Sequence, residues 1–118
     1  MSLHIEQREV EGIVILDLKG PLTLGHGDLE LRDRLPSLPQ SGQVNIILNL
    51  EHVSEIDSTG LGTLVFGLAR LRKSGGRLAL VNLNRSHLEL FLLTKLAIAF
   101  EFFEDEQDAV NSFFPDRA

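Results

Sequence analysis

The chain has 118 residues, 43% of them apolar and 24% charged, so we expect one domain, residues 1–118, with a buried core. Its 11 Lys and Arg against 17 Asp and Glu give a net charge of −6 with no basic stripe, which argues against direct nucleic-acid binding, and the absence of Cys excludes a disulfide framework and a Cys nucleophile. Because no apolar run approaches the roughly 20 residues of a membrane span and no signal peptide is found, we expect no membrane insertion and a cytoplasmic location.

A β-hairpin is predicted at the start of the chain. Residues 3–10 alternate loosely between apolar and polar side chains, and residues 13–18 are mostly aliphatic. The Glu-Gly pair at 11–12 between them indicates a tight turn. The Gly-Pro pair at 20–21 is expected to end the second strand, because Pro cannot donate to a sheet ladder.

A helix and a central strand are expected next. Asp28 follows a glycine-containing loop at 25–27 and is a candidate helix cap. Leucines at helical spacing mark the buried face: Leu31, Leu35 and Leu38. Pro36 and Pro39 limit how far this helix runs cleanly. Residues 44–50 carry apolar side chains on both faces, as a central strand covered on both sides does.

The pattern then changes to a helical period. A short strand over 53–56 is expected to lead into a helix from Asp57, whose apolar stripe is Leu61, Leu64, Val65, Leu68 and Leu71. The last turn of this helix carries Lys and Arg, which the negative end of the helix dipole favours, and a Gly pair at 75–76 ends the helix.

The last third of the chain repeats this alternation. We expect a strand over 77–82, a helix from a capping box at Ser86 and Glu89 through Leu93, an edge strand over 100–103, and a final helix from Asp105. The predicted order ββαβαβαβα, with about four helices, indicates a single α/β domain with a mixed, largely parallel β-sheet.

The junction at residues 56–62 is the candidate functional site. Asp57 and Ser58 have the residue types that cap helices, and capping alone is one interpretation. The alternative is that Ser58, or less favourably Thr59, is a phosphoacceptor, since a helix N-terminus tolerates a phosphate. Gly60 and Gly62 favour a functional interpretation, because each costs a helix about 1 kcal/mol relative to Ala and leaves the backbone open to a partner.

Charge predicts what a phosphate at this junction would do. Between Glu51 and Ala69 the chain has no Lys or Arg, and its charges are the carboxylates of Glu51, Glu55 and Asp57. A phosphate, with a charge of about −1.5 to −2, would deepen this negative patch. We therefore expect a switch that repels a bound partner.

Enzymatic interpretations fail on spacing. Val65 replaces the third glycine of a dinucleotide fingerprint, and Ser58 lacks the Gly-x-Ser-x-Gly elbow of hydrolases. Four histidines are scattered and are expected to be exposed, two of them in loops: His4, His26, His52 and His87. The C-terminal carboxylates are interpreted as a solvated face: Glu101, Glu104, Asp105, Glu106 and Asp108. We expect no catalytic residue, no metal site and no cofactor, and so no enzyme.

Residues 49–62, which read NLEHVSEIDSTGLG, resemble the signature of the STAS domain family, which includes the bacterial anti-sigma factor antagonists. Gly20, the Gly pair at 75–76 and a Phe-containing helix ending near Leu96 also fit, so the resemblance covers nearly the whole chain.

The resemblance implies partner switching. The unphosphorylated antagonist binds a serine-kinase anti-sigma factor, the kinase phosphorylates the motif Ser, the complex dissociates, and a serine phosphatase reverses the reaction. The acceptor corresponds to Ser58, with Thr59 as a lesser candidate. The implied partner-binding residues are Asp57, Ser58, Thr59, Gly60, Leu61 and Gly62, with Leu61 or Thr63 partly exposed.

Two departures from the family pattern affect these expectations. Thr23 stands where the family often has an acidic residue, which concerns partner contacts. Lys95 stands where it often has Gly, and we expect the turn to be rebuilt because a positive φ is unfavourable for Lys. The alternative function is a non-phosphorylated STAS scaffold, or an accessory subunit of a signalling complex or a membrane transporter ATPase.

Overall fold

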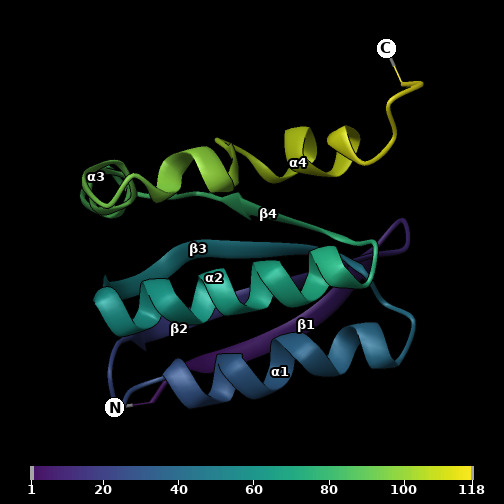
Figure 1. The fold of residues 1–118 in the computed structure, drawn as a ribbon. Helices are drawn as coiled ribbons and strands as arrows, with labels where there is room; N and C mark the ends of the chain where they lie inside the picture. The colour runs from purple at the N-terminus through teal and green to yellow at the C-terminus, as the bar shows by residue number, and fades with distance from the viewer. Residues whose placement is uncertain (1, 118) are drawn as a thin grey trace.

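The computed structural model describes residues 2–117, which form a five-stranded sheet with helices packed on both faces (Figure 1). In chain order the elements are β1 (His4–Val10), β2 (Ile13–Leu22), α1 (Asp28–Gln40), β3 (Asn45–Ile56), α2 (Ser58–Lys73), β4 (Arg77–Val81), α3 (Arg85–Leu93), the 3-10 helix η1 (Leu96–Ala99), β5 (Glu101–Phe103) and α4 (Glu106–Ser112). The strands lie in the order β1-β2-β3-β4-β5, with β1 antiparallel to β2 and the other pairs parallel. The predicted α/β class, element order and mixed sheet are confirmed.

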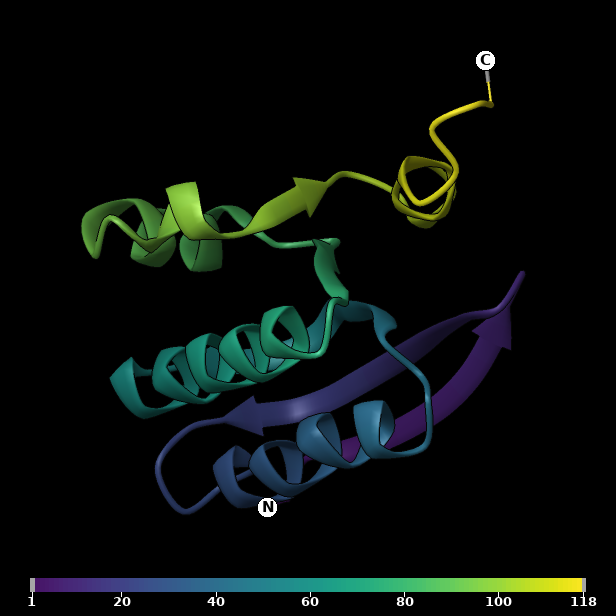
Figure 2. The same ribbon diagram turned by 45° about the vertical axis from the view of Figure 1, so that its right-hand side comes forward.

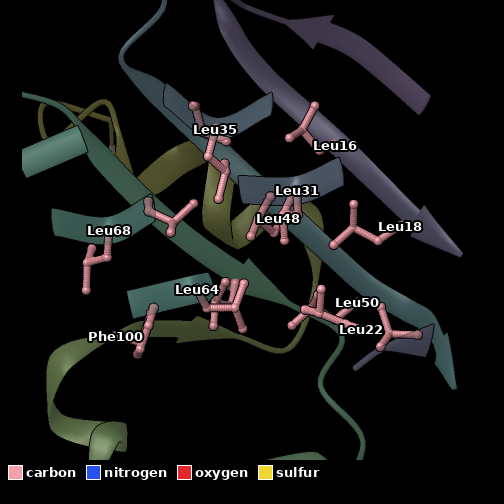
Figure 3. Packing of buried hydrophobic residues seen from close by; sticks show 14 of the residues in the cluster. Leu16, Leu18, Leu22, Leu31, Leu35, Leu48, Leu50, Leu64, Leu68 and Phe100 are labelled. Carbon is pink, nitrogen blue, oxygen red and sulfur yellow. The ribbon is translucent and has the colours of Figure 1, made fainter. Parts of the chain in front are cut away.

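Two apolar cores lie on opposite faces of the sheet. Successive strand residues point to opposite faces, so in β2 Leu16 packs toward α1 and α2, whereas Ile15 packs toward α4. The larger core is built mainly from leucines (Figure 3), and α4 covers the smaller one, apart from the other helices (Figure 2). In β3, Leu48 belongs to the first core and Ile47 to the second, as expected of a central strand covered on both sides.

Both β2 and β3 are longer than predicted. β2 does not end at residues 20–21 but continues to Leu22, because register shifts at 17–19 and 20–21 place Pro21 at an irregularity in the ladder. β3 joins the two predicted strands into one, and its last residue, Ile56, pairs with Leu22. This added pairing carries the sheet up to the residue before Asp57.

Two helices begin differently from the predictions. Gly27, with φ +93°, caps α1, while Asp28 is its first residue and accepts a hydrogen bond from the Gly25 N–H at 3.0 Å. α1 also runs through both of its prolines to Gln40. Asn84, not Ser86, caps α3, and its side chain accepts from the His87 N–H at 2.8 Å. Gly, Asp, Asn and Ser are all favoured at the cap position, so residue type alone does not reveal which of two nearby candidates is the cap.

The turn after α3 keeps its left-handed conformation although it has no glycine. Lys95 has φ 63° and ψ 15° and leads directly into η1. The expected rebuilding of this turn is therefore wrong. The surrounding structure holds a non-glycine residue in a conformation that is costly for side chains with a Cβ.

Candidate functional site

Ser58 lies at the point where the sheet gives way to α2. β3 ends at Ile56, Asp57 has extended backbone, and Ser58 is the first residue of α2. Ser58 is exposed and Thr59 is half-buried. The hydroxyl of Ser58 is thus accessible at the positive end of a 16-residue helix, a position that suits a negatively charged modification.

Asp57 fixes both the helix start and a neighbouring loop. One carboxylate oxygen accepts from the Gly60 N–H at 2.9 Å, and the other accepts from the Leu24 N–H at 3.0 Å. Burial favours the neutral acid, but hydrogen bonds from the backbone of Leu24, Gly60 and Thr59 outweigh it, and the pKa of Asp57 is lowered. Asp57 is therefore a charged neighbour of Ser58 at neutral pH.

The two glycines of the first turn have different roles. A Cβ on Gly60 would lie 2.0 Å from the carbonyl oxygen of Leu22, so Gly60 is required for close packing of α2 on β2. A Cβ on Gly62 would meet no described atom within 4 Å, and Gly62 is exposed. Of the two, only Gly62 leaves backbone open to a partner, which corrects the common interpretation given to both.

Leu61 and Thr63 do not contribute to the exposed surface. Leu61 is 2% and Thr63 is 0% exposed, and the Thr63 hydroxyl donates to the Thr59 carbonyl at 3.1 Å. The expectation that one of them is partly exposed is wrong. Leu61 packs in the larger core with residues of the sheet and of α1, and Thr63 is fully buried, so neither side chain is available to a partner.

Exposed apolar side chains lie instead in the loop between β2 and α1 and in the first turn of α1. Leu24 is 71% and Leu29 is 63% exposed. Backbone bonds of 2.9 Å in both directions between Thr23 and His26 close the loop, and Asp57 holds its Leu24 N–H. The family resemblance pointed to partner contacts at Thr23 in this loop, but apolar periodicity gave no signal for Leu24 or Leu29, because both fall outside the apolar stripe of α1.

A shallow depression lies beside Asp57, between this loop and the start of α3. The described residues that line it include two carboxylates, Glu55 and Asp57, and none of those residues is Lys or Arg; the full lining is Thr23, Ser54, Glu55, Ile56, Asp57, Ser86 and His87. Thr23 from the loop and Ser86 and His87 from α3 thus add no Lys or Arg beside the two carboxylates, and the negative character expected from the local sequence is kept.

Two histidines lie in places that the sequence did not predict. His87 was expected to be exposed, but only 5% of its surface is accessible to solvent, and burial lowers its pKa. Within the described part of the chain its Nδ1 has no hydrogen-bond partner. His52 lies in β3 rather than in a loop.

No metal centre is formed by the described residues. Within 2–117, no group of three or more His, Asp or Glu side chains is arranged to hold a metal ion. In the same range, no helix has both the length and the apolar character needed to cross a bilayer.

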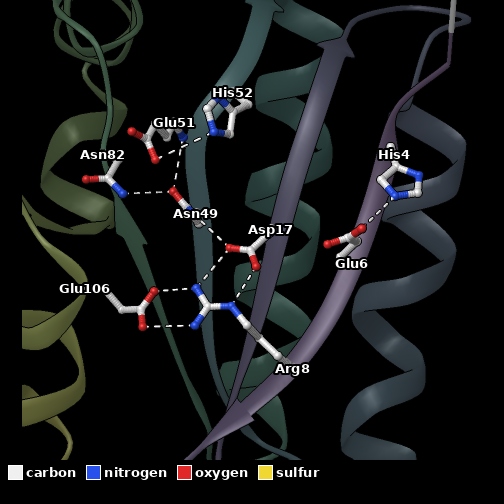
Figure 4. Close-up of polar contacts among 9 residues, drawn as sticks. All are labelled: His4, Glu6, Arg8, Asp17, Asn49, Glu51, His52, Asn82 and Glu106. Carbon is white, nitrogen blue, oxygen red and sulfur yellow. Dashed lines mark hydrogen bonds and ion pairs between the residues drawn. The ribbon is translucent and has the colours of Figure 1, made fainter.

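A polar cluster on the face of the sheet opposite α1 and α2 links the sheet to α4 (Figure 4). The guanidinium of Arg8 donates to Asp17 at 2.6 and 3.1 Å and forms an ion pair with Glu106, the first residue of α4. The Arg8 hydrogen bonds are the largest cause of a lowered pKa at Asp17. Glu106 is thus a partner in an ion pair, not part of a purely solvated acidic face, and Glu101 likewise pairs with Arg77.

Comparisons with known proteins relate the chain and its fold to one family. The model of the STAS domain family matches residues 4–109. The anti-sigma-B factor antagonist of Bacillus subtilis is 30% identical over 96 residues, which make up 81% of this chain and 86% of that protein. The crystal structure of a candidate anti-sigma factor antagonist from Thermotoga maritima has a TM-score of 0.84 and 27% identity, and the match covers 92% of each chain.

The fold is also that of SpoIIAA, an anti-sigma factor antagonist from Bacillus that has been solved in two states. The unphosphorylated form gives a TM-score of 0.73 at 19% identity, over 97% of this chain and 100% of that chain. The phosphorylated form gives 0.71 at 21% identity, over 93% of this chain and 99% of that chain.

Proposed function

The chain belongs to the STAS domain family, and from this premise we propose that it is an anti-sigma factor antagonist that binds a serine-kinase anti-sigma factor and is released when Ser58 is phosphorylated. The observation that carries the proposal is the position of Ser58, exposed at the first residue of α2 and next to an ionised Asp57. Thr59 is half-buried, which supports Ser58 as the acceptor.

The chemistry of release is electrostatic repulsion. A phosphate on Ser58 would add a charge of about −1.5 to −2 next to Asp57. The N–H groups at the start of α2 and the helix dipole would allow the fold to accept this charge. Of the described residues lining the adjacent depression none is cationic, so the added charge would remain on the surface that faces the partner.

The proposal assigns the chain no catalytic role of its own and no cofactor. A serine-kinase anti-sigma factor supplies the phosphate, and a serine phosphatase removes it. The partner surface consists of the exposed part of residues 57–62, the loop with Leu24, and Leu29 in the first turn of α1. We place this exchange in the cytoplasm. The competing function is a scaffold or an accessory subunit of a signalling complex or transporter ATPase, in which Ser58 is only a surface residue.

Charge-mimicking variants separate these functions. The affinity of purified Ser58→Ala and Ser58→Asp chains for the serine-kinase anti-sigma factors of the same genome is measured by titration calorimetry. We expect Ser58→Ala to bind as the wild type does and Ser58→Asp to bind at least tenfold more weakly. Equal affinities for the two variants would mean that charge at this position is not the switch.

A further inference from the structure

We infer that the outer face of α2 beyond Ser58 is a second docking surface for the same anti-sigma kinase. The matching surface of the kinase would be an apolar pocket with carboxylates at its edge. This inference rests on the proposed function and adds the chemistry of the partner surface. The docking stripe, as we call it, consists of Gly62, Phe66, Arg70 and Lys73 of α2 with Arg32 of α1.

An aromatic ring held between two cations forms the centre of the docking stripe. Phe66 is 36% exposed, although most large aromatic side chains of the chain lie in the cores. The Cζ atoms of Arg32 and Arg70 lie 5.3 and 5.6 Å from the centre of its ring. These cation–π contacts hold the ring at the surface between α1 and α2, where it is preorganised for contact with a partner.

The docking stripe is continuous with the phosphorylation site. Gly62 and Phe66 follow Ser58 at four and eight residues, so the ring lies about 12 Å along the helix axis from the acceptor at 1.5 Å per residue. An interface that buries about 800 Å² on each partner spans this distance easily. Gly62 is exposed and offers backbone for close approach between the two positions.

The charge of the docking stripe is opposite to that of the chain as a whole. Against a net charge of −6, its cations Arg32, Arg70 and Lys73 are exposed and have no carboxylate within ion-pair distance in residues 2–117. Arg8, Arg77 and Arg117 are each paired with a carboxylate, whereas the other Lys and Arg side chains of residues 2–117, those of the docking stripe among them, form no ion pair. Arg70 and Lys73 also line a depression between the C-terminal ends of α1 and α2, which suits an acidic side chain.

These features favour a protein partner over a lipid or nucleic-acid surface. Polyanion-binding sites gather several cations, commonly four to eight for anionic membranes, whereas the docking stripe has three cations around an aromatic anchor. Interfaces between proteins concentrate their binding energy in such aromatic and Arg residues. Complementary carboxylates on the kinase would neutralise the cations and speed association at low salt.

Charge reversal tests the inference on the full chain with each purified serine-kinase anti-sigma factor. The variant Arg70→Glu/Lys73→Glu is compared with Lys19→Glu/Lys95→Glu, which changes the net charge equally at exposed cations outside the docking stripe. We expect the first to weaken binding at least tenfold and to flatten its dependence on NaCl, and the second to change it less than about twofold, since distant charges are screened. Phe66→Ala should weaken binding about tenfold.

The outcomes separate this inference from the proposed function. If wild type binds and Ser58→Asp does not, but the stripe variants bind as wild type, the inference fails and the proposed function stands. If the control variant loses as much affinity as the stripe variant, the inference also fails. Binding to anionic phospholipid vesicles that depends on Arg70 and Lys73 would overturn it as well. If wild type binds no kinase, both fail. Arg70→Gln/Lys73→Gln, which removes both charges without reversing them, should also weaken binding and replaces the reversed variant if that one does not fold; wild-type affinity in this variant would overturn the inference.

Discussion

Asp57 and Leu24 are joined across 33 residues of sequence by a 3.0 Å hydrogen bond from the Leu24 N–H to the Asp57 carboxylate. The same carboxylate caps α2 through the Gly60 N–H. One side chain therefore sets both the start of the helix that carries Ser58 and the loop that exposes Leu24. The two halves of the proposed partner surface depend on one residue.

Removing this carboxylate should loosen both structures. We expect Asp57→Ala to lower the free energy of unfolding by about 1–2 kcal/mol, as loss of an N-cap does, and Asp57→Asn to cost less because Asn also caps helices. Urea denaturation measures the stability. Hydrogen exchange should show faster exchange of the Leu24 amide in Asp57→Ala. Unchanged exchange at Leu24 would contradict the proposed coupling.

Lowering the pH should reveal how much the Asp57 carboxylate contributes to stability. The pKa of Asp57 is lowered in the folded chain, so its contribution to stability is complete above the unfolded pKa of about 3.9 and is lost as the pH falls through the folded value. We expect the stability of Asp57→Asn to fall less steeply than that of wild type below about pH 4. Parallel curves for the two proteins would show that Asp57 does not contribute.

Substitution by Ala should change the stability of the chain in opposite directions at Gly60 and at Gly62. Gly60→Ala places a methyl group 2.0 Å from the Leu22 carbonyl oxygen, and we expect it to destabilise the chain by about 2 kcal/mol or more. Gly62→Ala meets no described atom within 4 Å and should stabilise the chain by about 1 kcal/mol. Denaturation of the two variants under identical conditions measures both. Similar effects would contradict the packing of α2 on β2.

The left-handed turn at Lys95 should be relieved by glycine. Lys95→Gly removes the Cβ from a residue with φ 63°, and we expect a gain of about 1 kcal/mol. Lys95→Ala is the control, because it removes the charge but keeps the Cβ, and it should leave stability nearly unchanged. If both variants behave alike, the backbone conformation of Lys95 is not strained.

Local patterns were sufficient for most of the fold. The helical period of the leucines and the apolar runs of the strands predicted the order of elements, and the signature around Ser58 is the basis of the proposed site. The extension of β2 to Leu22 could not be predicted, because it depends on pairing with β3 and on an irregularity that accommodates Pro21.

Within the site, the sequence could not distinguish residues that share a type but differ in surroundings. Gly60 and Gly62 look equivalent until Leu22 is placed against one of them. The exposure of Leu24 and Phe66 and the burial of His87 likewise arise from how distant segments pack. Tertiary contacts, not local propensity, decide these positions.

Phosphorylation of Ser58 is tested most directly by intact-mass spectrometry. The purified chain is incubated with ATP and each candidate serine-kinase anti-sigma factor, with Ser58→Ala and Thr59→Ala as matched variants. The account predicts that wild type and Thr59→Ala each gain the mass of one phosphate and that Ser58→Ala gains none. No gain by wild type with any of these kinases, or an equal gain by Ser58→Ala, would contradict it.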